Sequence, residues 1–243
     1  LMQEFQRINA WVFDLDNTLY PTTLELFSQI DVRMTSFIQK ELQVDCDEAY
    51  KIQKDYLGEY GTTLSGLMNH HNMPPERFLD FVHDIDVSVL SPDPALAAAI
   101  DALPGRKFIF TNGTEAHAER VSNRLGVHHL FHDVFDIVAA NYIPKPQAEV
   151  YPAMVEKFDI QADEAVFFED MARNLAPAHR IGMTTVLVHS EDDDGTGNMG
   201  LNGRLPVQET NFIDHKTTNL TGFLQAILAH LESPSDAAHA TAD

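Results

Sequence analysis

Short apolar runs alternate with longer helix-like segments after residue 93, and this alternation restricts the fold more than any other feature of the sequence. Apolar runs of strand length are expected to form strands, at 11–14, 107–111, 134–138, 165–168 and 184–188. The segments between them are expected to form helices, at 115–125, 147–158 and 172–180. Strands that alternate with helices build parallel sheets with helices on both faces. The sequence therefore predicts an α/β protein with a doubly wound parallel sheet.

Residues 22–90 interrupt this alternation, because their pattern is helical throughout. Apolar side chains recur there at spacings of three and four residues, as at Leu24, Phe27 and Ile30. That is the period of an amphipathic helix, and no strand is expected in this stretch. A helical insert directly after the first strand is expected to form a lid over the edge of the sheet.

Proline-rich segments flank the helical insert and are expected to be hinges, near Tyr20-Pro21 and near Ser91-Pro92-Asp93-Pro94. We therefore divide the chain into a core, residues 1–20 and 93–232, and an all-helical cap, residues 21–92. The last residues, 233–243, are small and polar and are expected to be disordered.

Charge and composition exclude several classes of partner. The chain of 243 residues carries a formal net charge of −21, which would repel the phosphate backbone of nucleic-acid polymers. No apolar run approaches the roughly 20 residues that span a bilayer, and no cationic leader with an apolar segment opens the chain. Cys46 is the single cysteine and cannot form an internal disulfide. We therefore expect a cytoplasmic protein that contacts neither membranes nor nucleic-acid polymers.

An apolar strand runs directly into two acids, Asp14 and Asp16, within the segment from Val12 to Leu19. Ligands bind at the carboxyl ends of the strands in parallel sheets. Two carboxylates at that place repel each other unless a cation or a proton lies between them. The pair therefore fits a magnesium site beside a carboxylate nucleophile.

Polar residues also follow the other expected strands. Thr111-Asn112-Gly113 ends the second strand, Lys145 lies in the loop after the third, and Glu169-Asp170 ends the fourth. Because the carboxyl ends of parallel strands share one edge, we expect these residues to converge on Asp14. Carboxylates, a hydroxyl, an amide and an ammonium together fit the chemistry of phosphoryl transfer.

Each of these residues has an expected role in that chemistry. Asp14 is expected to attack phosphorus and form an aspartyl-phosphate, while Asp16 protonates the leaving alkoxide and then deprotonates the attacking water. Thr111 and the N–H groups of Asn112-Gly113 are expected to bind phosphate oxygens at the start of a helix. Lys145 would neutralise negative charge shared by the nucleophile and the phosphate.

Magnesium is the expected cofactor, since it prefers oxygen ligands and keeps several of its waters. Asp14 and Asp170 are expected to bind it directly, and Glu169 through a water ligand. The substrate expected from this set of residues is a small phosphate monoester.

Four ordered segments of the chain resemble the four motifs of the haloacid dehalogenase (HAD) superfamily. They are Asp14-x-Asp16-x-Thr18, Thr111-Asn112-Gly113, Lys145-Pro146 and Glu169-Asp170, and the match covers residues 10–190. The resemblance implies a Rossmann-like core with a C1-type cap inserted after the first motif. It also implies a magnesium site to which the main-chain carbonyl of Asp16 contributes.

Within that superfamily, three segments resemble the pyrimidine 5′-nucleotidase branch, at 14–21, 61–67 and 167–175. The expected activity is therefore magnesium-dependent hydrolysis of nucleoside 5′-monophosphates, with pyrimidines preferred. A sugar-phosphate or phosphoglycolate phosphatase on the same core is the alternative. Carbon–halogen cleavage is less expected, because a halide leaving group does not need the acid Asp16. A catalytically inactive phosphate-ester sensor is disfavoured, because the expected nucleophile, acid and lysine are all present.

Other candidate sites are weaker. Residues 195–200 match a dinucleotide-binding pattern, but no helix-forming run follows and the acidic residues 191–194 would repel a pyrophosphate. We expect a loop from 190 to 203. The histidines at 70–71, and those at 128–129 with His132, lack cysteine partners and helix-spaced pairs, so surface histidines are expected there rather than a transition-metal site.

Overall fold

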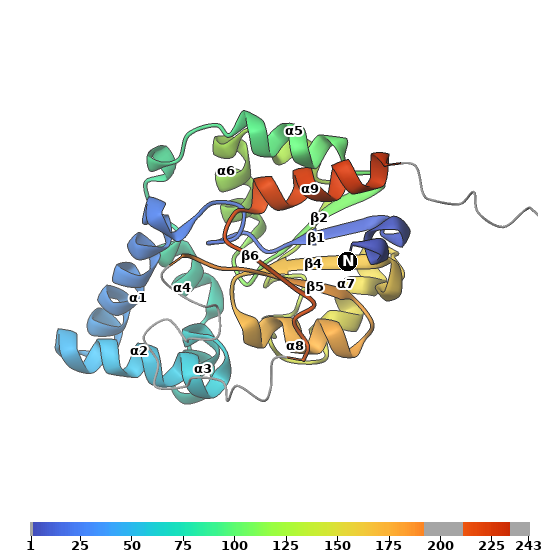
Figure 1. The fold of residues 1–243 in the computed structure, drawn as a ribbon. Coiled ribbons are helices and arrows are strands. Elements are labelled where there is room, and N and C mark those ends of the chain that lie inside the picture. The colour runs from blue at the N-terminus through green and yellow to red at the C-terminus, as the bar shows by residue number, and fades with distance from the viewer. Residues whose placement is uncertain (1, 192–210, 234–243) are drawn as a thin grey trace, which may run out of the picture.

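A six-stranded parallel sheet forms the centre of the protein in the computed structural model, which describes residues 2–191 and 211–233 (Figure 1). The strand order is β3-β2-β1-β4-β5-β6. The strands are β1 (Ala10–Phe13), β2 (Arg106–Phe110), β3 (Asp133–Phe135), β4 (Ala165–Glu169), β5 (Thr184–Val188) and β6 (His215–Thr217). In the register of β1, Phe13 pairs with Ile109 on one side and Phe168 on the other. The residue after Phe13 therefore emerges beside the ends of β2 and β4.

Helices cover both faces of this sheet (Figure 1). One face carries α5 (Pro94–Ala102), α6 (Glu115–Leu125) and α9 (Leu220–Glu232), and the other carries α7 (Val150–Phe158) and α8 (Ala172–Arg180). Short 3₁₀ turns complete the core, at η1 (Gln3–Arg7), η4 (His128–Leu130) and η5 (Ala162–Glu164). Successive side chains of β1 point to opposite faces, so Trp11 and Phe13 join one apolar cluster while Ala10 and Val12 join the other. A strand buried on both faces needs the continuous apolar run that the sequence has there.

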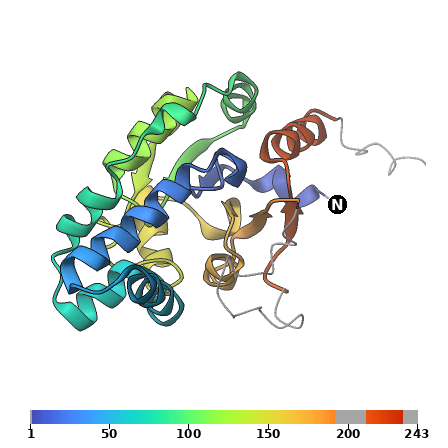
Figure 2. The same cartoon turned by 90° about the vertical axis from the view of Figure 1, so that its left-hand side faces the viewer.

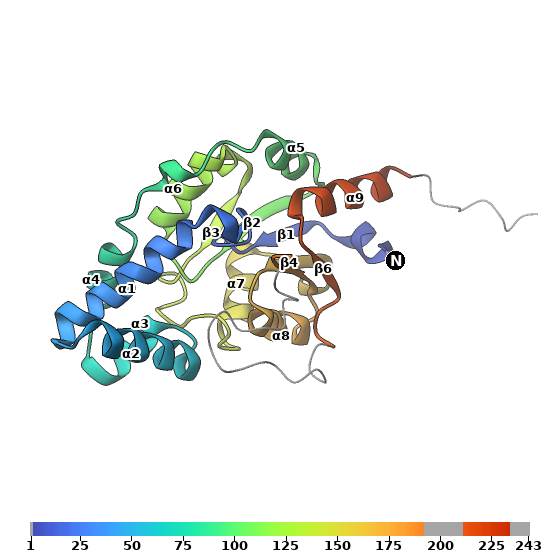
Figure 3. The same ribbon diagram turned by 60° about the vertical axis from the view of Figure 1, so that its left-hand side comes forward.

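The chain between β1 and β2 is helical, as the spacing of its apolar residues predicted. It contains α1 (Leu26–Leu42), α2 (Cys46–Tyr60), α3 (Thr63–His71) and α4 (Pro75–Val82), with 3₁₀ turns η2 (Thr22–Leu24) and η3 (Val87–Val89). Side-chain oxygens of Asp45 and Thr62 accept hydrogen bonds from main-chain N–H groups and so begin α2 and α3. Figures 2 and 3 show these helices grouped beside the sheet, and we call them the cap. The prediction of a doubly wound α/β core with an inserted helical cap is confirmed.

Several element bounds differ from those expected. The helices 115–125 and 172–180 and the strand 184–188 are confirmed. The third strand ends at Phe135 rather than at 138, because the carboxylate of Asp136 accepts hydrogen bonds from the N–H groups of Glu115 and Ala139 and turns the chain. The helix expected from 147 begins at Val150.

The strand β6 was not predicted, because its three residues lack an apolar run. The expected loop at 190–203 and the expected disordered tail at 233–243 fall mostly outside the described residues, as does the dinucleotide-like pattern at 195–200. Among the described residues, no helix has both the length and the apolar character needed to cross a membrane.

Candidate active site

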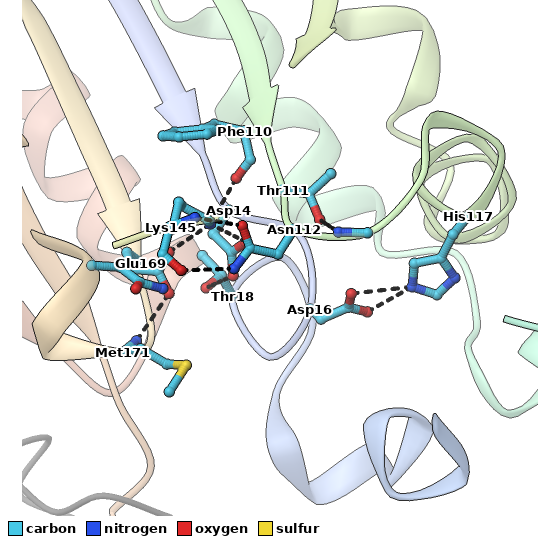
Figure 4. A network of polar contacts seen from close by, with 12 residues as sticks. Asp14, Asp16, Thr18, Phe110, Thr111, Asn112, His117, Lys145, Glu169 and Met171 are labelled. Atoms are coloured by element: carbon cyan, nitrogen blue, oxygen red, sulfur yellow. Dashed lines mark hydrogen bonds and ion pairs between the residues drawn. The ribbon is translucent and has the colours of Figure 1, made fainter. Parts of the chain in front are cut away.

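Asp14 lies at the centre of a buried polar cluster at the carboxyl ends of β1, β2 and β4 (Figure 4). Its N–H donates to the carbonyl of Phe168, which extends the pairing of β1 with β4 by one residue. Its side-chain oxygens accept hydrogen bonds from Lys145 Nζ at 2.8 Å and from Thr18 Oγ1 at 3.2 Å. The strand thus fixes the main chain of Asp14, while Lys145 and Thr18 fix its carboxylate.

Lys145 is buried and makes three hydrogen bonds through its ammonium. Nζ donates to Asp14 Oδ1 at 2.8 Å, to Glu169 Oε2 at 2.7 Å and to the carbonyl of Phe110 at 2.9 Å. These contacts use all three protons of the ammonium. Burial acts to lower the pKa of Lys145, but attraction and hydrogen bonds from the Asp14 and Glu169 carboxylates together outweigh it and raise the pKa, so the side chain is charged.

The loop that carries Lys145 is held by Asn112. Asn112 Oδ1 accepts from the N–H of Lys145 at 2.8 Å, and Asn112 Nδ2 donates to the carbonyl of Lys145 at 3.2 Å. The side chain of Asn112 therefore positions Lys145. The main-chain N–H of Asn112 remains as a hydrogen-bond donor for a phosphate.

Glu169 and Asp170 complete the cluster. One oxygen from each of Asp14, Glu169 and Asp170 lies within 4.8 Å of the others. Glu169 is buried, and its second oxygen accepts from the N–H of Met171 at 3.0 Å. Three carboxylates face one ammonium here, which leaves two negative charges to be balanced if all three are ionised. The oxygen donors and this excess of negative charge fit a divalent cation such as Mg²⁺.

Burial and mutual repulsion favour the protonated forms of Asp14 and Asp170. Burial, together with the charge of Glu169, raises the pKa of Asp14 to about 7, although Lys145 opposes this shift. The same two causes raise the pKa of Asp170 well above its ordinary value. Burial also acts to raise the pKa of Glu169, but the charge of Lys145 and hydrogen bonds to Asp170 and Lys145 outweigh it, so the pKa of Glu169 is lowered. Competition of this kind between protons and a cation is typical of metal sites.

Asp16 points away from this cluster, toward His117 (Figure 4). Its carboxylate accepts from Tyr20 Oη at 2.6 Å and lies 3.0 and 3.1 Å from His117 Nε2. Burial acts to raise the pKa of Asp16, but His117 and the hydrogen bond from Tyr20 outweigh it and lower the pKa. The two acids of the first motif therefore have different surroundings and opposite pKa shifts.

Thr111 and Gly113 begin the turn that leads into α6. Thr111 is buried, and its Oγ1 accepts from the N–H of Gly113 at 2.9 Å. Thr111 Oγ1 keeps its own proton for donation. A Cβ at position 113 would lie 3.2 Å from His117 Cδ2 and 3.3 Å from Thr111 Oγ1, so the turn is tightly packed.

A comparison with protein-family models gives a match over residues 8–182, to the haloacid dehalogenase-like hydrolases. The matched segment covers well over half of the chain and includes every residue of the polar cluster. The chain belongs to the haloacid dehalogenase-like hydrolases. The family resemblance predicted from the four motifs is therefore confirmed.

Two relatives of this HAD-like hydrolase have names that refer to phosphate. "Phosphate metabolism protein 8" of Saccharomyces cerevisiae is 28% identical over 205 residues, which cover 75% of this chain and 62% of the yeast protein. A "Glyceraldehyde 3-phosphate phosphatase" of Methanopyrus kandleri is 26% identical over 196 residues, covering 74% of this chain and 84% of that protein. The chain thus spans less than two thirds of the yeast relative but most of the archaeal one.

Among solved structures, an L-2-haloacid dehalogenase from Xanthobacter autotrophicus has the same fold. The TM-score is 0.55 at 16% identity, and the match covers 90% of this chain and 98% of the dehalogenase. At that identity the similarity concerns the fold alone. It agrees with a helical cap inserted between β1 and β2 of a HAD-like core.

The cap of this HAD-like hydrolase contacts the core beside the polar cluster. Arg173, from α8, donates to the carbonyls of Leu57 at 3.3 Å and Gly61 at 3.2 Å, at the carboxyl end of α2. A Cβ at position 61 would lie 3.2 Å from Pro146 Cδ and 3.4 Å from the carbonyl of Lys145. The end of α2 therefore rests on the loop that carries Lys145.

The cap segment 61–67, which resembles the pyrimidine 5′-nucleotidase branch, has local structural roles in the cap. Thr62 begins α3, while Thr63 and Leu67 are buried inside the cap. The histidines at 70–71 bond to tyrosines rather than to each other: His70 Nε2 lies 2.7 Å from Tyr60 Oη, and His71 Nε2 lies 2.8 Å from Tyr56 Oη. No set of three metal-ligating side chains includes them among the described residues.

Sequence reasoning missed His117, Tyr20 and Arg173 as members of the site. His117 lies in the first turn of a helix that the sequence predicted correctly, directly after a strand end that was assigned to the site. That position was the available signal, since the first turn of such a helix faces the edge where ligands bind. Contacts between the core and the cap have no comparable signal in the sequence.

Proposed function

We propose that the chain hydrolyses small phosphate monoesters through an aspartyl-phosphate on Asp14. The observation that carries this proposal is the buried Asp14 carboxylate, bonded to Lys145 at 2.8 Å and grouped with Glu169 and Asp170. A carboxylate held by an ammonium, beside oxygen ligands for a divalent cation, has what in-line phosphoryl transfer requires. The names of two relatives, both linked to phosphate, support the same activity.

The proposed reaction has two displacements. An oxygen of Asp14 attacks phosphorus, the bond from phosphorus to the ester oxygen breaks, and that oxygen takes a proton from Asp16 as it leaves. A water then attacks the phosphoryl group, gives a proton to Asp16, and releases inorganic phosphate with free Asp14. Lys145 keeps the Asp14 carboxylate in place, and Thr111 with the N–H groups of the following turn would bind phosphate oxygens.

Magnesium fits this site on the chemistry of its donors. Asp14 and Asp170 would hold the ion, with the main-chain carbonyl of Asp16, and Glu169 would act through a water ligand. When bound, the ion supplies positive charge that offsets the charge of the phosphoryl group. Glu169 also accepts from Lys145 and from the N–H of Met171, which orients it toward the cluster without a metal.

Sugar phosphates are the substrate class that we favour. The M. kandleri relative is a glyceraldehyde 3-phosphate phosphatase by name, and a second phosphatase of that name, from Methanocaldococcus jannaschii, is 28% identical over 197 residues. The pyrimidine preference expected from the sequence has no support from these relatives. The alternative expectation, a phosphatase of sugar phosphates or phosphoglycolate, is therefore better supported than the nucleotidase. We further propose residues 21–92 as the cap that closes over the substrate and 1–20 with 93–232 as the core.

A dehalogenase is a second candidate because of the shared fold. Its test is simple, since a dehalogenase releases halide from a 2-haloacid without consuming a phosphate ester. Asp16 favours the phosphatase, because its contacts with Tyr20 and His117 hold an acid that a halide leaving group would not use.

The deciding experiment is phosphate release with magnesium and with EDTA. The panel contains glyceraldehyde 3-phosphate, phosphoglycolate, hexose phosphates, UMP, CMP and AMP, with 2-chloropropionate and halide detection alongside. We expect magnesium-dependent release that favours short sugar phosphates, and none from Asp14→Asn. Preference for UMP or CMP would restore the nucleotidase, and release of halide alone would favour the dehalogenase. If no compound reacts, the catalytically inactive phosphate-ester sensor is the hypothesis that remains.

A further inference from the structure

Among residues 2–191 and 211–233, the side chain of His117 forms hydrogen bonds with Asp16 alone. Its Nε2 lies 3.0 Å from Asp16 Oδ1 and 3.1 Å from Asp16 Oδ2, while its buried Nδ1 has no hydrogen-bond partner among the described residues. The side chain is 0% exposed. A buried polar ring with one unpaired nitrogen is less stable than an apolar side chain of similar shape. The contact with Asp16 is therefore the feature that explains a histidine at this position.

The cap supplies a second ring that packs on His117. His83 follows α4 of the cap, and its ring stacks on that of His117 with 4.4 Å between centroids and 5° between planes. Core side chains hold His83 in turn. Thr114 Oγ1 lies 3.2 Å from its Nδ1, and Arg120 Nη1 donates to its carbonyl at 2.8 Å. Asp16 is thereby connected through two stacked imidazoles to the cap.

The direction in which Asp16 points agrees with its proposed chemistry. In an in-line displacement, the leaving oxygen lies on the far side of phosphorus from the attacking atom. An acid that serves this oxygen has to be held away from Asp14, at a distance that leaves room for the phosphoryl group. Asp16 is turned away from Asp14 and toward His117, as this geometry requires (Figure 4).

We propose that His117 is a positioning residue that orients the Asp16 carboxylate toward the leaving group, and that His83 of the cap fixes the ring of His117. This inference rests on the proposed phosphatase function. It predicts that the cap influences the proton-transfer step through the His83–His117 stack, in addition to covering the site. Neither histidine needs to touch the substrate for this role.

The test compares two esters whose leaving groups differ in basicity. An alkoxide needs a proton from the acid as it leaves, whereas 4-nitrophenolate leaves without one. The esters are 4-nitrophenyl phosphate and the alkyl phosphate that the wild-type protein hydrolyses fastest in the panel. The variants are His117→Leu, which removes the hydrogen bond, and His117→Gln, whose amide N–H can replace that of Nε2. His83→Ala removes the stacked ring, and His83→Phe keeps a ring without its nitrogens.

We expect His117→Leu to lower kcat/KM for the alkyl phosphate by about 10²-fold, within the range of general acid catalysis, and to lower kcat/KM for 4-nitrophenyl phosphate by less than about threefold. The comparison uses kcat/KM because this constant covers only the first displacement, up to the departure of the leaving group. Asp16→Asn should show the same selectivity in kcat/KM. His117→Gln should recover most of the lost kcat/KM, and His83→Phe should lie closer to wild type than His83→Ala. The kcat values for the two esters should both fall, because Asp16 also takes the water proton when the shared aspartyl-phosphate is hydrolysed.

Equal losses of kcat/KM with both esters would overturn the inference, because they would indicate a purely structural role for His117. A gain in kcat/KM for the alkyl phosphate, or no change in His117→Leu, would also overturn it. Thermal unfolding of each variant identifies any that fail to fold. If His117→Leu fails to fold, the test rests on the comparison of His117→Gln with wild type and of His83→Phe with His83→Ala. If the wild-type protein hydrolyses neither ester, the proposed function fails and this inference fails with it. If it hydrolyses both esters and the selectivity is absent, only this inference fails.

Discussion

Lys145 Nζ donates a hydrogen bond of 2.8 Å to Asp14 Oδ1, although the two residues are 131 positions apart in the chain. Both side chains are buried, and the same ammonium also bonds to Glu169. The ion pair joins the end of β1 to the loop after β3, with β2 lying between these strands. Lys145 thus links three strand ends, and its positive charge lies beside the carboxylate of Asp14, the nucleophile that we propose.

Replacing Lys145 by Met should strongly destabilise the protein. The change leaves Asp14 and Glu169 as buried carboxylates without their cation, and loss of one partner of a buried pair costs about 3–5 kcal/mol. The loss should be smaller at pH 5 than at pH 8, since protonation of the carboxylates removes their repulsion. Urea denaturation at both pH values in EDTA measures the difference.

Lys157→Met is the matched control for this change. Lys157 lies on α7 with its side chain 38% exposed, 3.5 Å from Asp133. Exposed ion pairs contribute only about 0–1 kcal/mol, so this variant should remain close to wild type at both pH values. If Lys145→Met proved no less stable than Lys157→Met, the pairing of Lys145 with the cluster would not matter for folding.

The raised pKa of Asp14, about 7 against an ordinary 3.8, gives a prediction for stability without metal. The folded state holds this proton more tightly than the unfolded state, so the stability that it contributes is lost as pH rises from about 4 through about 7. Asp14→Asn lacks this loss. The Tm of Asp14→Asn minus that of wild type should therefore increase from pH 4 to pH 7 in EDTA. Asp101→Asn, which changes an exposed side chain on α5, should show no such trend.

Magnesium should act in the opposite direction at pH 7, by raising the Tm of wild type relative to that of Asp14→Asn. A cation that binds only the folded state stabilises it by about 2.7 kcal/mol at a concentration of 100 times Kd. The Tm of wild type should rise on adding magnesium, and that of Asp14→Asn should rise less, because the variant has lost a ligand carboxylate. Equal rises in both proteins would exclude Asp14 as a ligand. Phosphatase activity of Asp14→Asn should fall by on the order of 10⁴-fold or more, as expected when a nucleophile is removed.

His83 should destabilise the folded state in acid. Burial, with the nearby charge of His117, lowers the pKa of His83 from 6.5 to about 3. The unfolded chain therefore binds a proton below about pH 6.5 that the folded chain refuses, and stability falls between pH 6.5 and pH 3. The Tm of His83→Phe minus that of wild type should increase as pH falls from 7 to 4. His129→Gln, at an exposed position, should leave the acid limb of the curve unchanged.

The sequence predicted the members of the cluster well, because their positions depend on topology alone. A parallel sheet brings the residues after its strands to one edge, so Asp14, Lys145, Glu169 and Asp170 could be grouped without coordinates. Their order along the chain also sufficed to indicate the family. The cluster geometry agrees with that expectation, while the chemical role of each residue stays a prediction.

The parts that the sequence did not predict depend on long-range packing. The contact of Arg173 with the carbonyls of Leu57 and Gly61 requires the cap to lie on the core in one orientation, and no local pattern encodes that orientation. The contact of His117 with Asp16 depends on which side of a helix turn faces the strand end. β6 was missed because its pairing with β5 is made by main-chain atoms, and its residues are not apolar.

Arg173 is expected to hold the cap on the core. Its guanidinium donates to two carbonyls at the carboxyl end of α2, where the helix dipole and unpaired carbonyls favour a cation. Hydrogen bonds from charged groups contribute about 1.5–3 kcal/mol each, so their loss would shift the balance between docked and open cap. Arg173→Met should therefore increase hydrogen exchange at 57–63 and at 144–147, where the cap rests on the loop of Lys145.

The control for Arg173→Met is Arg180→Met, which changes an exposed arginine at the end of the same helix, α8. Hydrogen exchange in β4 and β5 should remain slow in both variants, because these strands lie in the buried sheet. If exchange rose across the whole core in Arg173→Met, the residue would support the fold in general. If exchange at 57–63 and 144–147 matched wild type, other contacts, such as that of Tyr142 with Glu76, would suffice to dock the cap. An increase confined to the two segments identifies Arg173 as the residue that keeps α2 against Lys145.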